Sequence, residues 1–189
     1  KKGLCYLLMT RKLKKHPLKQ KICIIKMNHK VDNYRYELKY ILNESTINEA
    51  LKLIHIKAKA IKKFESRTVN SIYFDDINFS NANDNLIGLS MRKKFRLRWY
   101  DNLDSVNFEV KSKLNRLNSK RLIPILLEDK KIKDLTISEI NDICQKQIFN
   151  KFKILTNHNE PTLGVKYIRE YYERQDGIRI TIDKKISFY

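Results

Sequence analysis

Glycine, cysteine and acidic residues are all scarce in this chain of 189 residues. Its four glycines, Gly3, Gly88, Gly164 and Gly177, are far apart in sequence, which excludes a glycine-rich phosphate loop of the P-loop or Rossmann type. The three cysteines cannot form a disulfide framework or a Cys-x-x-Cys metal site. We therefore expect a protein of a reducing compartment, the cytoplasm. No stretch approaches the roughly 18 apolar residues that a membrane-spanning helix needs.

The shortage of acidic residues leaves a large positive charge. The sequence has 40 Lys and Arg against 21 Asp and Glu, a formal net charge of +19, which indicates an anionic partner. Residues 1–26 hold nine of these basic residues and no acid, and we interpret them as a basic leader that is disordered or not native. The body, residues 27–189, keeps 31 basic and 21 acidic residues, so the excess belongs to one domain as well as to the leader.

Alternation of polar and apolar side chains is the strongest pattern in the body, and it predicts β-strands. Segment 91–100 places four cations on one face of a strand and mainly apolar residues on the other. The four cations are Arg92, Lys94, Arg96 and Arg98. Further strands are predicted at 34–40, 68–74, 106–114, 120–124, 166–174 and 178–183. Helical spacing predicts helices over 47–64 and 128–152, the second of which is open to interruption, and the Asn-rich segment 75–88 predicts a loop.

A charged strand face is ordinarily solvated, but here at least four strands repeat it with few carboxylates to neutralise it. Neighbouring side chains on one face of a sheet lie only about 5 Å apart, so the cations repel one another. We therefore expect the sheet to curl around a polyanion whose phosphate oxygens bind Arg and Lys. The apolar faces would then point outward under the helices. Because the removal of one cation relieves its repulsion with its neighbours, we expect Arg96→Ala and Arg98→Ala to leave the fold intact.

Four carboxylates share these cationic faces: Glu37, Glu109, Glu173 and Asp183. Each is either a structural ion pair with a neighbouring cation or a ligand of a divalent metal that bridges it to phosphate. The metal interpretation is strongest for Glu109 and Glu37.

Seven segments match a known family, in order, across residues 34–183. They are RYELKY (35–40), VNSIYFD (69–75), RKKFRLRWY (92–100), FEVKSK (108–113), SKR (119–121), YIREYYER (167–174) and GIRITID (177–183). The chain resembles the VTC domain, the polyphosphate polymerase domain of the triphosphate tunnel metalloenzyme, or CYTH-like, superfamily. The specific feature is the ordered set, above all the RxRWY strand followed by the Glu-x-Lys strand.

The resemblance implies an α+β fold in which an antiparallel β-barrel-like tunnel is covered by helices. It implies a transferase that moves the γ-phosphoryl group of ATP onto polyphosphate, with Mn²⁺ or Mg²⁺ as cofactor and ATP and polyphosphate as partners. Carried over by position, the catalytic residues would be Arg96, Arg98 and Lys111. The substrate-binding residues would be Lys39, Lys94, Lys120, Arg169 and Arg179, and the metal ligands Glu109 and Glu37.

The sequence departs from the family in two places. It stops at Tyr189, before a later family strand that carries a metal-ligating Glu, so we expect residues 27–189 to form a tunnel domain without its C-terminal strand or strands. Its first strand has one Glu where the phosphatase relatives have Glu-x-Glu-x-Lys, which favours the polymerase branch. The alternatives are a non-catalytic module that binds polyphosphate or nucleotide, and a triphosphatase of the same superfamily. A specific nucleic-acid partner is not expected, because the aromatic side chains alternate away from the cations.

Overall fold

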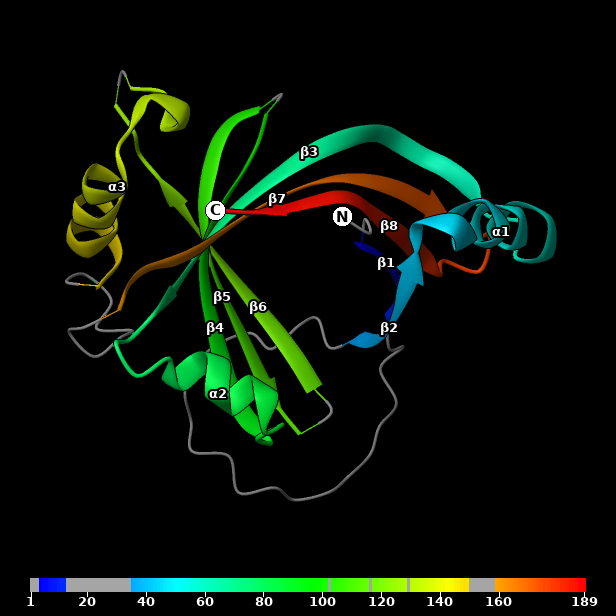
Figure 1. Cartoon of the computed structure of the whole chain (residues 1–189), viewed down its shortest axis with the longest axis horizontal. Coiled ribbons are helices and arrows are strands. Elements are labelled where there is room, and N and C mark those ends of the chain that lie inside the picture. The colour runs from blue at the N-terminus through cyan, green and yellow to red at the C-terminus, as the bar shows by residue number, and fades with distance from the viewer. Residues whose placement is uncertain (1–3, 13–34, 102, 116, 129, 150–158) are drawn as a thin grey trace.

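The computed structural model describes residues 4–12, 35–101, 103–115, 117–128, 130–149 and 159–189 (Figure 1). The described residues form eight strands. These are β1 (Leu4–Lys12), β2 (Arg35–Asn43), β3 (Ile61–Asp75), β4 (Met91–Tyr100), β5 (Leu103–Leu114), β6 (Leu117–Ile125), β7 (Glu160–Glu173) and β8 (Arg179–Phe188). The α-helices are α1 (Ile47–Lys52), α2 (Ser80–Leu86) and α3 (Ile137–Cys144). Short 3₁₀ or π turns are η1 (Glu44–Thr46), η2 (Leu53–Lys57), η3 (Ile132–Asp134) and η4 (Gln145–Phe149).

All eight strands pair antiparallel in one sheet with the order β2-β1-β8-β7-β3-β4-β5-β6. The sheet is strongly twisted and curled, so that its two edge strands, β2 and β6, approach each other (Figure 1). The predicted α+β class with an antiparallel sheet and covering helices is confirmed. The sheet stays open between β2 and β6, so it curls like a barrel without closing into one.

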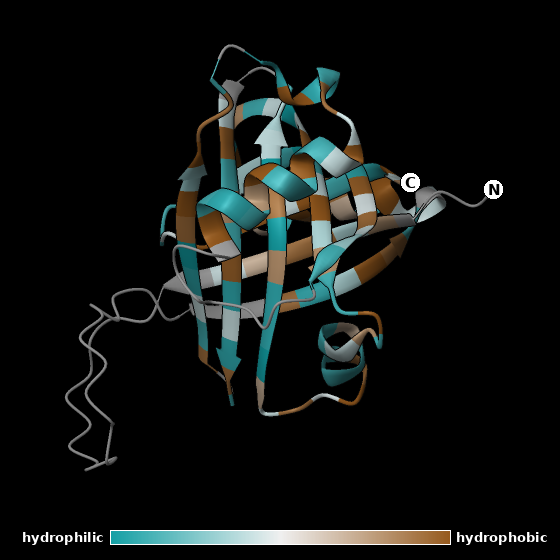
Figure 2. Cartoon of the chain, turned by 90° about the vertical axis from the view of Figure 1, so that its left-hand side faces the viewer, coloured by the Kyte–Doolittle hydropathy of each residue, from teal (hydrophilic) through white to brown (hydrophobic). Residues whose placement is uncertain are grey.

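The apolar face of the sheet points outward and is covered by helices, as the sequence predicts. The first apolar cluster lies between the sheet and α3 with η4, and Figure 2 shows this helical layer over the strands. Its buried members are Ile72, Phe74, Phe95, Leu97, Val106, Phe108, Val110, Ile123, Ile125, Ile140, Cys144 and Ile148. Trp99 packs against this cluster from the apolar face of β4. Helix α3 begins with a capping box, in which the side chains of Thr136 and Glu139 each accept a backbone N–H.

The second apolar cluster lies beneath α1 and η2, at the other end of the sheet. Its buried members are Cys5, Leu7, Ile54, Ala60, Tyr172, Ile180 and Ile182. The two clusters together place the cores on the outside of the curled sheet. The concave face carries the cationic strand positions together with some apolar residues such as Leu8 and Ile186, and this arrangement positions the site. Within the described ranges, no helix combines the length and the apolar character needed to cross a membrane.

Strand β1 falls within residues 1–26, the segment interpreted as a basic leader. It pairs with both β2 and β8. Its Cys5 and Leu7 are 1% and 8% exposed and belong to the second cluster. These two side chains are buried against segments that are distant in sequence, which explains why a count of charged residues along the chain did not predict the strand. Residues 13–26 lie outside the described part of the chain.

Two predictions of local secondary structure in the body are wrong. The helix expected over 47–64 ends with η2, and β3 begins at Ile61 because it pairs with β7 over almost its whole length. The loop expected over 75–88 contains α2. The Asp75 carboxylate accepts the backbone N–H groups of Asn81 and Ala82, and the Asp76 carboxylate accepts that of Ser80. These side-chain acceptors satisfy the first turn of the helix. The stretch expected over 128–152 is interrupted into η3, α3 and η4.

Candidate functional site

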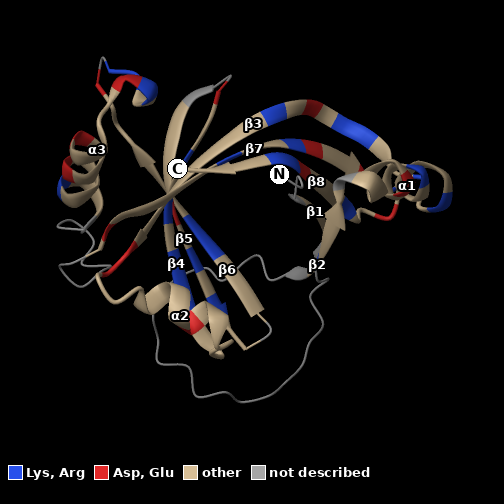
Figure 3. Ribbon diagram, in the orientation of Figure 1, with Lys and Arg blue, Asp and Glu red and all other residues tan. Residues whose placement is uncertain are grey.

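The register of β4, β5 and β6 aligns cations on the concave face of the sheet. Lys94 on β4 lies opposite Lys111 on β5, which lies opposite Lys120 on β6. Directly opposed residues of an antiparallel pair share one face, with Cβ atoms about 5 Å apart. The three lysines therefore form a row across three strands, where Figure 3 shows the Lys and Arg positions close together. In the next row, Arg96 lies opposite Glu109.

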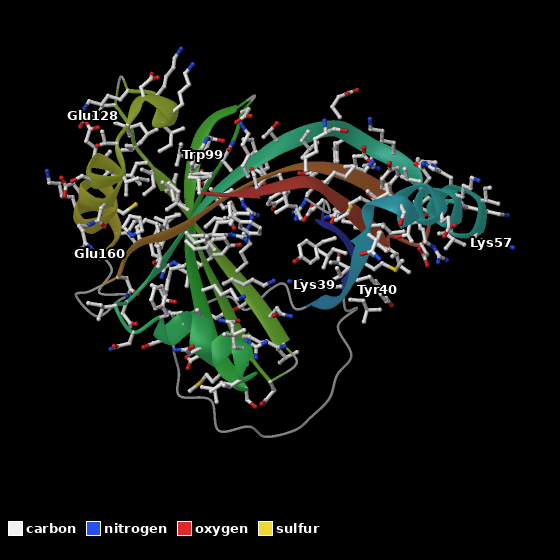
Figure 4. The ribbon with its side chains drawn as sticks, in the orientation of Figure 1. Lys39, Tyr40, Lys57, Trp99, Glu128 and Glu160 are labelled. Carbon is white, nitrogen blue, oxygen red and sulfur yellow. The ribbon has the colours of Figure 1, made fainter. Side chains whose placement is uncertain are left out.

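This face borders a cavity of about 900 Å³, a volume within the usual range for small-molecule sites. Seven of the predicted catalytic and substrate-binding residues line it: Lys39, Lys94, Arg96, Arg98, Lys111, Lys120 and Arg169. They come from β2, β4, β5, β6 and β7. Figure 4 shows Lys39 and Tyr40 on opposite sides of β2, and Lys39 is the one of the two that lines the cavity. The fold therefore brings together cations that are separated by up to 130 positions in sequence, from Lys39 to Arg169.

Two further predicted site residues, Arg179 and Glu37, are not among these seven. Arg179 is exposed at the start of β8, beside the β7–β8 turn, and lies outside the described residues that line the cavity. Glu37 lies on β2 in register with Thr10. Its side chain falls outside the described part of the structure, so its role as a metal ligand stays a prediction.

Glu109 is the centre of a buried ion cluster. It is 3% exposed, and its Oε2 accepts a hydrogen bond from Arg96 Nε at 2.6 Å. Lys120 Nζ lies 2.6 Å from Oε1, and Arg98 Nη1 lies 3.7 Å from Oε2. Burial raises the pKa of Glu109, but Arg96, Arg98 and Lys120 outweigh that effect and hold the pKa below its ordinary value. The carboxylate is therefore ionised at neutral pH and neutralises part of the cationic face.

Arg98 is held more rigidly than the alternation of β4 suggests. It is 5% exposed, its Nε donates to Ser71 Oγ at 3.1 Å, and its Nη2 donates to the Tyr167 hydroxyl at 3.1 Å. Three groups of other strands therefore fix its guanidinium: Ser71 on β3, Tyr167 on β7 and Glu109 on β5.

Tyr73 and Tyr167 are site residues that sequence reasoning missed. Arg96 Nη1 donates to the Tyr73 hydroxyl at 3.1 Å, and both tyrosines line the cavity. Burial raises the pKa of Tyr73, but Arg96 and Arg98 outweigh burial and lower it. A hydroxyl that accepts from a guanidinium keeps its own O–H to donate to an anion. The available signal was the alternation of β3, which puts Ser71 and Tyr73 on one face.

Arg169 forms a bidentate pair with Asp183 at the β7–β8 side of the cavity. Its Nε lies 2.6 Å from Oδ1 and its Nη2 lies 2.7 Å from Oδ2. Burial lowers the pKa of Arg169, but the hydrogen bonds and charge of Asp183 outweigh it, so the pKa is raised. Parallel N–H···O bonds of this kind fix the plane of the guanidinium as well as its position. Asp183, one of the four carboxylates on the cationic faces, is thus a structural partner.

The surroundings of Lys94 disfavour its charged form, and replacement of this lysine gives a test of the site. Lys94 is exposed by surface area but partly desolvated beside the cavity, and this desolvation lowers its pKa below the ordinary 10.5. Lys39, Arg92 and Arg96 lower the pKa further, while Tyr73 acts in the opposite sense. We expect Lys94→Met to leave the thermal unfolding midpoint of the ligand-free protein unchanged or higher. The same variant should bind tripolyphosphate at least 10-fold more weakly by calorimetry, because a charge-assisted contact to phosphate is lost.

The sign of the pH dependence follows from the same pKa shift. Because the folded protein releases the Lys94 proton at lower pH than the unfolded chain, Lys94 makes the free energy of unfolding rise as pH increases toward 10.5. This rise should be smaller in Lys94→Met. Lys93→Met is the matched control, since Lys93 is exposed on the opposite face of the same strand. A fall in stability in Lys94→Met alone would contradict the interpretation of Lys94 as a repelled cation.

The carboxylates in and beside the cavity do not form a ready metal site. No group of three or more His, Cys, Asp or Glu suited to a metal ion occurs among the residues that the structure describes. Both oxygens of Glu109 already face cations, and both oxygens of Asp183 bind Arg169. A divalent metal at Glu109 would have to displace Lys120 or Arg96. The metal assignment of Glu109 stays a prediction that its ion pairs do not support.

The eight strands thus form a curled antiparallel sheet with a cation-lined cavity on its concave face. Residues 34–189 match the family model of the VTC domain, and the chain belongs to that family. The resemblance drawn from the sequence is therefore confirmed. The CYTH-like superfamily that includes the VTC domain consists of enzymes such as triphosphatases and polyphosphate polymerases, and its members bind nucleoside triphosphates or polyphosphate-like substrates.

Comparisons with individual proteins give less information than the family model does. No curated protein matches the chain. One similar solved structure is that of a protein from Hippeastrum, described as a candidate adenylyl cyclase with a dominant triphosphatase activity. It is 9% identical with a TM-score of 0.37, and the match covers 97% of this chain and 79% of that chain.

Proposed function

We propose that this protein is a phosphotransferase that moves the γ-phosphoryl group of ATP onto the end of a polyphosphate chain inside the cavity. The observation that carries the proposal is the convergence of seven Lys and Arg side chains from five strands on one cavity of about 900 Å³. These cations repel one another, and a ligand with several linked phosphoryl groups would stabilise them, since each phosphoryl oxygen accepts charge-assisted hydrogen bonds.

Phosphoryl transfer asks little covalent chemistry of the protein, because positioning and charge neutralisation supply most of the rate. A terminal phosphate oxygen of the chain attacks the γ-phosphorus of ATP, the bond from that phosphorus to the bridging oxygen breaks, and ADP leaves with the electron pair. In this proposal Arg96, Arg98 and Lys111 contact the transferred group. The remaining cavity cations bind the rest of the two chains: Lys39, Lys94, Lys120 and Arg169.

The fixed position of the two arginines supports their assignment to the transferred group. Ser71 and Tyr167 hold Arg98, and Tyr73 holds Arg96, so neither guanidinium has to reorganise as charge develops. The superfamily implies a divalent metal such as Mn²⁺ or Mg²⁺. Because the described carboxylates do not form its site, we assign no step to it.

The test is incubation of the purified protein with ATP and either Mn²⁺ or Mg²⁺, followed by gel analysis of polyphosphate and quantitation of ADP and free phosphate. A polymerase releases ADP and makes chains of increasing length. Free phosphate without chains would replace the proposal with a triphosphatase. Binding of tripolyphosphate without any turnover would replace it with a non-catalytic binding module. Arg92→Ala serves as the control for nonspecific charge effects, because Arg92 is a cation of β4 that lies outside the described cavity lining.

A further inference from the structure

An acidic side chain buried among cations needs a reason, and Glu109 is such a side chain. Its side chain is 4% exposed, while those of its partners Arg96, Arg98 and Lys120 are 17%, 6% and 35% exposed. Arg96, Arg98 and Lys120 line the cavity, and Glu109 lies buried against them. A carboxylate in this position weakens the attraction of the three cations for an anionic ligand. The register explains how it arrives, since Glu109 lies opposite Arg96 on the β4–β5 hairpin.

The two oxygens of the Glu109 carboxylate contact different cations. Oε2 accepts a hydrogen bond from Arg96 Nε and lies 3.7 Å from Arg98 Nη1, whereas Oε1 is paired with Lys120 Nζ at 2.6 Å. Three cations and one carboxylate leave two positive charges in the cluster. A carboxylate and a phosphoryl group offer the same kind of acceptor oxygens to guanidinium and ammonium groups. In its geometry toward the cations, Glu109 therefore resembles a bound phosphoryl group.

The three partners differ in how firmly they are held. Arg98 also donates to Ser71 and Tyr167, and Arg96 also donates to Tyr73. Lys120 has the most exposed side chain of the three, and a lysine ammonium on a flexible stem reorients more easily than a guanidinium held by several acceptors. Lys120 is thus the partner best placed to leave Glu109 and turn toward a ligand.

We propose that Glu109 is a positioning residue, an internal counterion that holds Arg96, Arg98 and Lys120 together in the ligand-free cavity and gives up Lys120 to a phosphoryl oxygen when polyphosphate binds. The inference rests on the proposed function in one respect, that linked phosphates bind in this cavity. It replaces the expectation that Glu109 is a metal ligand. A buried cluster of three cations without this carboxylate would carry desolvation and repulsion with no compensation.

The experiment compares the wild type with Glu109→Gln in metal-free buffer containing EDTA, using calorimetric titration with sodium tripolyphosphate and thermal unfolding. Glu109→Gln should unfold at a lower temperature without ligand, because three buried cations lose their counterion. It should bind tripolyphosphate at least 5-fold more tightly, and the ligand should raise its unfolding temperature by more than it raises that of the wild type. Unchanged or weaker metal-free binding by folded Glu109→Gln would overturn the proposal, as would loss of Mn²⁺ binding measured with the metal alone.

A second variant keeps the test decisive if Glu109→Gln fails to fold. The double variant Glu109→Gln/Lys120→Met removes one charge of each sign and should be more stable than Glu109→Gln, since the coupled partner is gone as well. A double variant that does not fold, or that is no more stable than Glu109→Gln, would overturn the counterion role. The wild-type titration reports on the proposed function separately. If wild-type protein does not bind tripolyphosphate, the proposed function fails, whereas the double-variant comparison still tests the counterion.

Discussion

Arg98→Ala is expected to abolish tripolyphosphate binding and to lower the free energy of unfolding by about 3 kcal/mol. The arginine is 5% exposed, and its removal leaves Ser71 and Tyr167 without their donor and leaves a cavity where the side chain stood. It also takes one cation from the buried carboxylate of Glu109. Chemical denaturation measures the loss of stability, and calorimetric titration measures the loss of binding.

Two comparisons isolate the role of Arg98. Arg98→Lys retains the charge but cannot reach Ser71, Tyr167 and a ligand together, so binding should weaken at least 10-fold while part of the stability returns. Arg92→Ala removes one cation from the same strand outside the described cavity lining and should leave binding within about 2-fold of wild type. Wild-type affinity in Arg98→Ala would contradict its place in the site.

This expectation differs from the one drawn from sequence, which held that the loss of Arg96 or Arg98 would leave the fold intact. The expectation from sequence rested on the repulsion between neighbouring cations on β4. The structure supplies the partners from other strands: Glu109 for both arginines, Tyr73 for Arg96, and Ser71 with Tyr167 for Arg98. Both arginines are thus structural as well as candidate ligand-binding residues.

Arg169→Ala should weaken tripolyphosphate binding at least 100-fold and lower the free energy of unfolding by about 2 kcal/mol. The substitution removes a cation from the cavity and leaves the Asp183 carboxylate, which is 13% exposed, without its bidentate partner. The unpaired carboxylate then repels the phosphates, so the loss of affinity exceeds that of one hydrogen bond.

Asp183→Asn is the matched partner for this prediction. It breaks the same ion pair but keeps the arginine and removes the negative charge, so stability should fall while tripolyphosphate binding stays within a few-fold of wild type or improves. Denaturation curves and titrations of both variants decide the matter. An equal loss of binding in the two variants would show that Arg169 acts only through the structural pair and not on the ligand.

The strands around the site could be predicted well because a strand repeats every two residues and its pattern is local. The alternation in segment 91–100 predicted β4 and its cationic face, and that of 106–114 predicted β5. The helix boundary near residue 58 could not be predicted in this way. Apolar residues such as Ile61 and Phe64 suit either a helix or a strand, and pairing with β7, about 100 residues later, decides for a strand.

The same limit explains why β1 and the tyrosines were missed. Strand β1 is basic at its end, and its place between β2 and β8 depends on burial of Cys5 and Leu7 against a cluster formed from several distant segments. Tyr73 and Tyr167 have ordinary positions in alternating strands. Their roles arise from Arg96, which lies 23 residues from Tyr73, and from Arg98, which lies 69 residues from Tyr167.

The amino-acid sequence by itself determined which strand faces are cationic and which are apolar, because side-chain direction along a strand depends only on the position of a residue in that strand. The sequence also allowed the VTC domain family to be identified. Only the tertiary structure decided which cations share a cavity and which carboxylates neutralise them, placing Glu109 with Arg96, Arg98 and Lys120 and leaving Arg179 apart. The physical reason is that these contacts depend on strand order and register, which are set by packing across the whole sheet.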